Sequence, residues 1–135
     1  MAATVALFAT ALCLGGMVFF TAAVAPLVFR VLPAEAAGRF IRAIFPVFYL
    51  YVLATSGAAA VALIPLSGTA AGMMAAVAGL AFWLRQVLLP RINTLSDQAR
   101  AGQEEAARRF RQLHRLSVLA NLLQMATVMA VLAGF

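Results

Sequence analysis

The polar side chains with the clearest chemical potential lie on the last apolar segment of the chain. His114, Ser117, Asn121 and Gln124 stand at positions i, i+3, i+7 and i+10. With a helical period of about 3.6 residues, these positions share one face of a helix. Polar and ionisable side chains are costly inside a membrane, so this face is a candidate functional site.

Two interpretations of this face stay open. In the first, it lines a polar, hydrated pocket open to the cytoplasm, with Arg85 contacting an anion, His114 as a titrating group and Arg30 of the first loop as a further member of the site. In the second, Asn121 and Gln124 form hydrogen bonds between helices, while Arg85 and His114 extend to lipid headgroups. The residues taken alone favour the second.

The sulfur-containing side chains form a second candidate group. Cys13 and Met17 are spaced i,i+4 near the N-terminus, and Met125 and Met129 are spaced i,i+4 near the C-terminus. Thiolate and thioether sulfur are ligands for soft ions such as Cu(I). Methionine is also a common filler of apolar interfaces, and no M-x-x-M or C-x-x-C motif occurs. Packing is therefore the favoured interpretation.

The sequence contains no recognisable catalytic constellation. With a single histidine and no acidic residue inside the apolar segments, it offers no carboxylate pair and no Ser-His-Asp set. His114 and an axial methionine would suit haem, but Met125 and Met129 lie about three and four turns further along the same segment. We expect neither an enzyme nor a cofactor. A haem- or Cu(I)-binding membrane redox protein is the alternative.

The composition sets the class of protein. Hydrophobic residues make up 65% of the 135 residues and charged residues only 10%, and the mean hydropathy is +1.01. A soluble domain carries about 25% charged residues, so this chain lacks the polar groups to cover a water-exposed surface. We expect a single membrane domain over residues 1–135.

Four apolar segments are long enough to cross a hydrocarbon core, which takes about 20 helical residues. Each must be a helix, because lipid offers backbone amides no hydrogen-bond partner. The first segment lacks a basic n-region and is about twice as long as a signal-peptide core, so we expect it to be retained. The predicted spans are residues 3–29, 43–64, 70–89 and 113–135.

The charges predict the orientation of these spans. The formal net charge is +6, and the cations are ten arginines. Nine of them lie in residues 30–42 and 91–115, whereas residues 65–69 carry no charge. Basic loops stay in the cytoplasm, where they meet anionic headgroups. The sequence therefore predicts two cytoplasmic basic loops, both termini outside and a protein of the bacterial inner membrane. Nucleic acid is not an expected partner, because no aromatic residues alternate with the arginines.

The longer basic connection has helical features of its own. Residues 104–109 contain two Glu-to-Arg pairs at i,i+4, the order that stabilises a helix. The third span can continue past Pro90, kinked or restarted at the proline. We expect a cytoplasmic helical hairpin over residues 90–112, with its turn near Ala101 and Gly102.

Small residues predict how the helices pack. Helices in lipid associate where small side chains let their backbones approach closely. The expected fold class is an all-α, integral membrane four-helix bundle, and the same residues would serve a homodimer or a larger membrane complex. The small pairs at i,i+4 are Ala11/Gly15, Ser56/Ala60, Gly72/Ala76 and Ala75/Gly79.

Several short motifs, in order along nearly the whole chain, resemble one family. The chain is similar to the bacterial domain-of-unknown-function family 4149, which is related to eukaryotic transmembrane protein 205. The motifs are GMVFF at 16–20, APLVFRVLP at 25–33, Gly38, FPVFY at 45–49, LPRIN at 89–93, and FRQLHRLS at 110–117 running on to Asn121.

The resemblance implies a four-span membrane protein with no established activity. Its matched positions include Arg30, His114 and Asn121, and of the four sulfur residues only Met17, so it shifts the expected functional site toward the cytoplasmic face. Pro33 and Gly38 would shape the first loop, and Pro46 would lie in the first turn of the second span. We therefore expect a binding, accessory or transport-related role.

Overall fold

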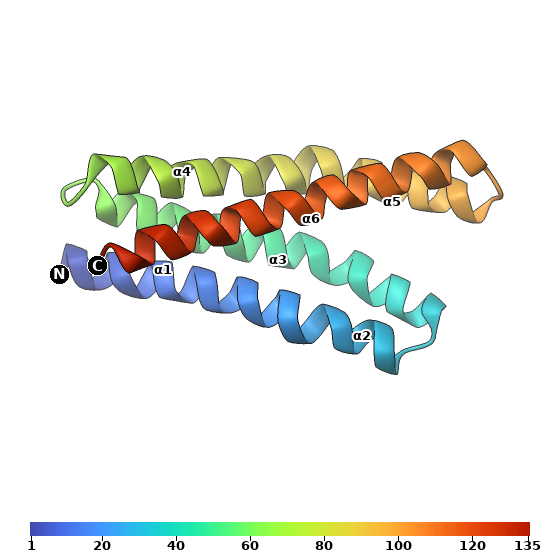
Figure 1. The fold of residues 1–135 in the computed structure, drawn as a ribbon, viewed down its shortest axis with the longest axis horizontal. Helices are drawn as coiled ribbons and strands as arrows, with labels where there is room; N and C mark the ends of the chain where they lie inside the picture. The colour runs from blue at the N-terminus through green and yellow to red at the C-terminus, as the bar shows by residue number, and fades with distance from the viewer.

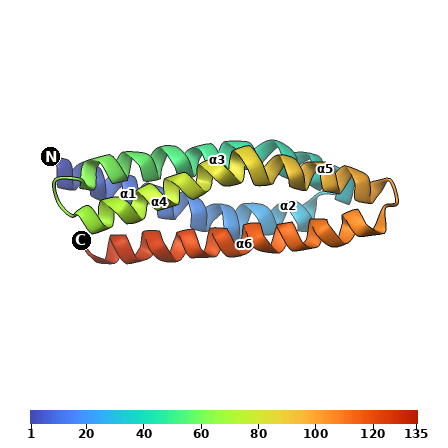
Figure 2. The ribbon, with the colours of Figure 1, turned by 90° about the horizontal axis from the view of Figure 1, so that it is seen from above.

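The computed structural model describes all of residues 1–135 and is helical almost throughout (Figures 1 and 2). Four of its helices are long and apolar enough to cross a membrane: residues 2–31, 34–63, 68–100 and 104–133. This confirms the prediction of an all-α chain with four such helices. The elements are α1 (Ala2–Phe19), the π-turn η1 (Phe20–Val24), α2 (Ala25–Val31), α3 (Ala34–Leu63), α4 (Gly68–Trp83), the π-turn η2 (Leu84–Leu88), α5 (Leu89–Arg100) and α6 (Glu104–Ala133).

The helices run up and down along one common axis. Both termini and the loop between α3 and α4 lie at one end of the bundle (Figure 1). The connections Leu32–Pro33 and Ala101–Gln103 lie at the other end. We call this second end the basic end, because the arginine-rich stretches 30–42 and 91–115 flank its connections. The α1–α2 helix and α4 are each packed against both α3 and α6.

Local chemistry explains where the helices begin and end. Ser67 caps α4, since its Oγ accepts a hydrogen bond from the backbone N–H of Ala70 at 3.2 Å. Gly102 has a φ of +93°, a conformation open mainly to glycine. This conformation lets the chain reverse between α5 and α6 within three residues.

Two π-turns interrupt the first and third helices, and a proline lies just beyond each of them. Ala25 and Leu89 donate their backbone N–H groups to the carbonyls five residues earlier, those of Phe20 and Leu84. Pro26 and Pro90 come next in the chain. A proline inside a helix lacks an N–H and its ring crowds the carbonyl four residues before it, so the preceding turn widens. The third helix is thus widened at Pro90 and continues to Arg100.

The predicted first loop is mostly helix, which corrects three expectations. Only Leu32 and Pro33 separate α2 from α3. Gly38 therefore lies in α3 rather than in a loop, and Pro46 lies well inside α3 rather than in its first turn. The physical reason is that Ala34–Arg42 is a good helix former, in which Glu35 and Arg39 pair at i,i+4 with an N···O distance of 3.3 Å.

Of the predicted pairs of small residues, only one is buried between helices. Ser56 and Ala60 are buried in α3 as predicted, but the pairs on the first and third spans face outward. The close approach of α1 to α3 occurs instead at Gly16. A Cβ atom there would lie 2.7 Å from Cζ of Tyr51, and the Tyr51 hydroxyl donates a hydrogen bond to the carbonyl of Leu12.

Candidate functional site

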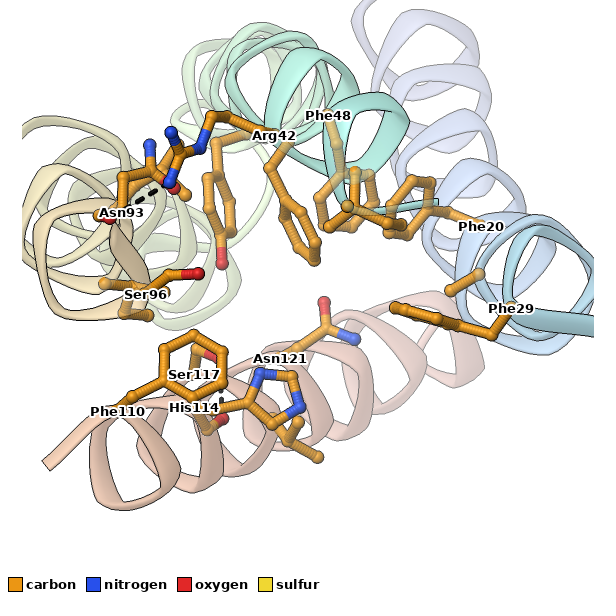
Figure 3. Close-up of a pocket in the computed structure, with 18 of the residues that line it drawn as sticks. Phe20, Phe29, Arg42, Phe48, Asn93, Ser96, Phe110, His114, Ser117 and Asn121 are labelled. Atoms are coloured by element: carbon orange, nitrogen blue, oxygen red, sulfur yellow. Dashed lines mark hydrogen bonds between the residues drawn. The ribbon is translucent and has the colours of Figure 1, made fainter. Parts of the chain in front are cut away.

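A cavity of about 430 Å³ lies among the four long helices in the half of the bundle toward the basic end (Figure 3). It receives side chains from η1 and α2, from the first half of α3, from α5, and from α6 between Phe110 and Leu122. Both helices that contain a π-turn contribute, through Phe20 and Thr21 on one and Leu89 on the other. The volume falls within the range of about 300–1,000 Å³ that is usual for small-molecule sites.

The deep part of the cavity is aromatic. Phe20 of η1 stacks on Phe48 of α3 with ring centroids 4.3 Å apart and an interplanar angle of 19°. Phe45 meets Phe20 edge to face at 5.3 Å. We call Phe20, Phe45 and Phe48 the aromatic floor. Since aromatic pairs of this kind are stabilising beyond the area that they bury, the floor also joins the first helix to α3.

The outer part of the cavity carries cationic and imidazole groups. Arg42, Arg100 and His114 all line it, and we call them the basic rim. Arg42 Nη2 binds Oδ1 of Asp97 at 2.8 Å and the Asn93 carbonyl at 3.0 Å. Arg100 has no ion-pair partner, and no carboxylate side chain lines the cavity. Arg100 is therefore the one arginine of the rim whose positive charge is not compensated by an ion pair, since Arg42 is paired with Asp97.

Two local features position the rim. A Cβ atom at Gly38 would lie 2.6 Å from Nη2 of Arg100. The absence of a side chain at Gly38 therefore leaves room for the Arg100 guanidinium to lie against α3. On α6, the ring of His114 stacks on Phe110 one turn earlier, with centroids 6.0 Å apart and an angle of 14°. The stack holds the imidazole at the mouth of the cavity.

Asn121 is the polar group at the level of the floor. Its Nδ2 donates to Oγ1 of Thr21 at 3.0 Å, and the Thr21 hydroxyl points on to Sδ of Met125 at 3.9 Å. Its Oδ1 is buried and has no hydrogen-bond partner. Figure 3 shows the Asn121 side chain directed into the space beneath Phe20 and Phe48.

The structure separates the six predicted site residues into two groups. His114, Ser117 and Asn121 line the cavity together. The other three lie outside it. Gln124 is buried and donates to the carbonyl of Val77 at 3.0 Å, tying α6 to α4. Arg85 donates from Nε to the carbonyl of Pro46 at 3.1 Å. Arg30 lies exposed at the end of α2.

The four sulfur residues do not form one cluster. Cys13 and Met17 are fully buried, with Sγ and Sδ 3.9 Å apart. Met125 contacts Thr21 and Asn121, and Met129 is 55% exposed on the outer surface. No group of three or more histidine, cysteine or acidic side chains is placed to hold a metal ion.

The sequence analysis did not identify most of the residues that line the cavity on the helices other than α6. Arg42 and Arg100, with Asn93 and Ser96, face His114 across the cavity. A signal was present on each helix: Asn93, Ser96 and Arg100 are spaced i, i+3 and i+7, a polar face like the one on α6. Residues 38, 42, 45 and 49 on α3 follow the same period.

Comparisons with known proteins give one family. The profile of a family described as "Domain of unknown function (DUF4149)" matches residues 8–101. This match covers three of the four cavity-lining segments, those of η1–α2, α3 and α5. No curated protein and no solved structure matches the chain.

Proposed function

The chain belongs to the DUF4149 family, and on that premise we propose that it is a bacterial inner-membrane protein that binds an anionic amphiphile in the cavity at its basic end. The family description names no activity, so the proposal rests on the site. Its main support is one observation: an aromatic floor lies beneath two arginines, of which Arg100 has no ion-pair partner, and no carboxylate is among the lining residues.

The proposed orientation places the basic end in the cytoplasm and both termini outside. It is supported by the distribution of charge, since all ten arginines lie between residues 30 and 115 and the loop at the opposite end carries none. Arginine-rich connections are retained on the cytoplasmic side. There the cavity would open at the level of the headgroups of the inner leaflet.

Cysteine labelling tests this orientation. In a Cys13→Ser background, we expect a membrane-impermeant maleimide added to intact spheroplasts to label Ser67→Cys and to leave Ala101→Cys unlabelled. Both positions are exposed at opposite ends of the bundle. After lysis, both variants should react, which controls for accessibility. Labelling of Ala101→Cys alone in intact spheroplasts would show that the orientation is the reverse of the one proposed.

The two parts of the cavity define the chemistry of the ligand. Phe20, Phe45 and Phe48 offer apolar contacts to a hydrocarbon chain, and burying each methylene is worth about 0.8 kcal/mol. Arg42 and Arg100 supply guanidinium donors, which bind carboxylate and phosphate groups well. The ligand that fits both parts is a chain with a carboxylate or phosphate head.

Matched probes test the binding of such a ligand. Protein held in amphipol is titrated with dodecanoic acid, dodecyl phosphate and dodecan-1-ol, at a pH where the acid is ionised. We expect saturable binding of one or both anions, and the stronger of the two identifies the headgroup. The alcohol, which has the same chain but no charge, should bind at least tenfold more weakly. Equal binding of the alcohol, or no saturable binding of either anion, would overturn the proposed function.

A further inference from the structure

One polar atom in the cavity has no partner within the chain. Oδ1 of Asn121 is buried and accepts no hydrogen bond, whereas the nitrogen of the same amide is bonded to Thr21 Oγ1. Leaving a buried acceptor unsatisfied costs about 1–3 kcal/mol. The rings of Phe20 and Phe48, which line the same cavity, have no donor to offer.

The amide is held in place by its surroundings. Thr21 Oγ1 accepts from Asn121 Nδ2 and directs its own hydrogen toward Sδ of Met125. This chain of contacts orients the amide so that its nitrogen faces η1. The oxygen is therefore presented as a fixed acceptor at the level of the aromatic floor.

The acceptor lies well below the basic rim. Asn121 is seven residues beyond His114 on α6, and at 1.5 Å per residue this corresponds to about 10 Å along the helix. Thr21, its hydrogen-bond partner, neighbours Phe20, which stacks on Phe48 six residues beyond Arg42 on α3. Six residues correspond to about 9 Å. Measured along the helix axes from His114 on α6 and from Arg42 on α3, the two rises are similar.

From this geometry we infer that the ligand carries a hydroxyl group on its hydrocarbon chain, about 10 Å from its anionic head, and that Asn121 Oδ1 accepts the hydrogen bond from it. This inference rests on the proposed function and narrows the ligand to hydroxylated anionic amphiphiles. In a zigzag chain with carbon–carbon bonds of about 1.5 Å, 10 Å corresponds to roughly eight bonds. The hydroxyl then falls near the ninth carbon of a fatty acid.

A positional series tests the inference. Wild-type protein is titrated with dodecanoic acid, 3-hydroxydodecanoic acid and 9-hydroxydodecanoic acid, which differ only in one hydroxyl. We expect the 9-hydroxy acid to bind about fivefold more tightly than the parent acid, the size of a net buried hydrogen bond. The 3-hydroxy acid should show no such gain. Equal affinities for all three acids, or a preference for the 3-hydroxy acid, would overturn the inference while leaving the proposed function intact.

Two variants assign the preference to one atom. Asn121→Leu removes the acceptor and should abolish the preference for the 9-hydroxy acid, measured as the ratio of its affinity to that of dodecanoic acid in the same variant. Gln124→Leu removes a buried amide from the same helix but outside the cavity, so the preference should persist. A preference that survives in Asn121→Leu would place the recognition elsewhere. The positional comparison in wild-type protein needs no variant and stands even if Asn121→Leu fails to fold.

Discussion

Replacing Arg42 and Arg100 together by glutamine is expected to weaken the binding of dodecanoate at least tenfold. Both guanidinium groups line the cavity, and hydrogen bonds to charged groups are worth about 1.5–3 kcal/mol when well formed. The groups are partly exposed, so we expect an effect near the low end of this range. Removing Arg42 also leaves Asp97 without its cation, which adds repulsion to an incoming anion. The measurement is a binding isotherm for each protein.

A matched double variant separates local contacts from the general electrostatic field. Arg91→Gln with Arg111→Gln removes the same two charges from the same end of the bundle, but neither residue lines the cavity. We expect this variant to bind dodecanoate within about threefold of wild type, since long-range attraction is screened by salt. Equal losses in the two double variants would show that net charge, and not the rim, attracts the ligand.

Gly16→Ala is expected to destabilise the bundle by about 1–3 kcal/mol, the usual cost of overpacking. The added methyl group would overlap the ring of Tyr51. The ring cannot easily move aside, because its hydroxyl is bonded to the carbonyl of Leu12. The free energy of unfolding, measured by titration with a denaturing detergent, checks this expectation.

The adjacent residue provides the control for Gly16. A Cβ atom at Gly15 would meet nothing within 4 Å, so Gly15→Ala should be neutral or slightly stabilising, as alanine favours a helix. Similar losses in the two variants would mean that the contact between Gly16 and Tyr51 does not hold α1 against α3.

The number of long helices is easier to predict from the sequence than the residues at which they begin and end. Four long apolar segments fix the number of membrane-crossing helices, because lipid leaves the backbone no other hydrogen bonding. The prediction of a loop over the arginine-rich segment 30–42 is wrong, because charge alone does not end a helix. Helix-forming residues, including the ion pair of Glu35 and Arg39, make most of this segment part of a helix. Pro46 lies inside α3 for the same reason.

The sequence analysis identifies cavity residues on one helix only. The polar face of α6 has an uninterrupted helical period, so the sequence places His114, Ser117 and Asn121 on one face, and all three line the cavity. Each π-turn adds a residue to its turn and rotates the later part of its helix by roughly a quarter turn. The faces of α2 and α5 beyond Phe20–Val24 and Leu84–Leu88 therefore cannot be assigned by counting from the start of the helix. Arg100 and Asn93 lie beyond the second of these turns.

The two side-chain amides of α6 show a second feature that cannot be predicted from the sequence, namely which of them bonds to another helix. Asn121 and Gln124 are three residues apart and look equivalent in the sequence. Gln124 donates its hydrogen bond to the carbonyl of Val77 in α4, whereas Asn121 keeps an unpaired oxygen beside the cavity. Only the position of the neighbouring helices distinguishes the amide that bonds to another helix from the amide whose oxygen has no partner.

The most direct test of ligand binding in this cavity is to locate the bound chain by photo-crosslinking. A dodecanoic acid with a diazirine near its terminal carbon is bound, irradiated and mapped by peptide mass spectrometry, with and without excess dodecanoic acid. We predict labelling that excess acid suppresses, on residues 117–122 of α6 and 45–49 of α3. Suppressible labelling confined to outward-facing residues such as Phe82 and Leu123, or labelling that excess acid does not reduce, would contradict the account.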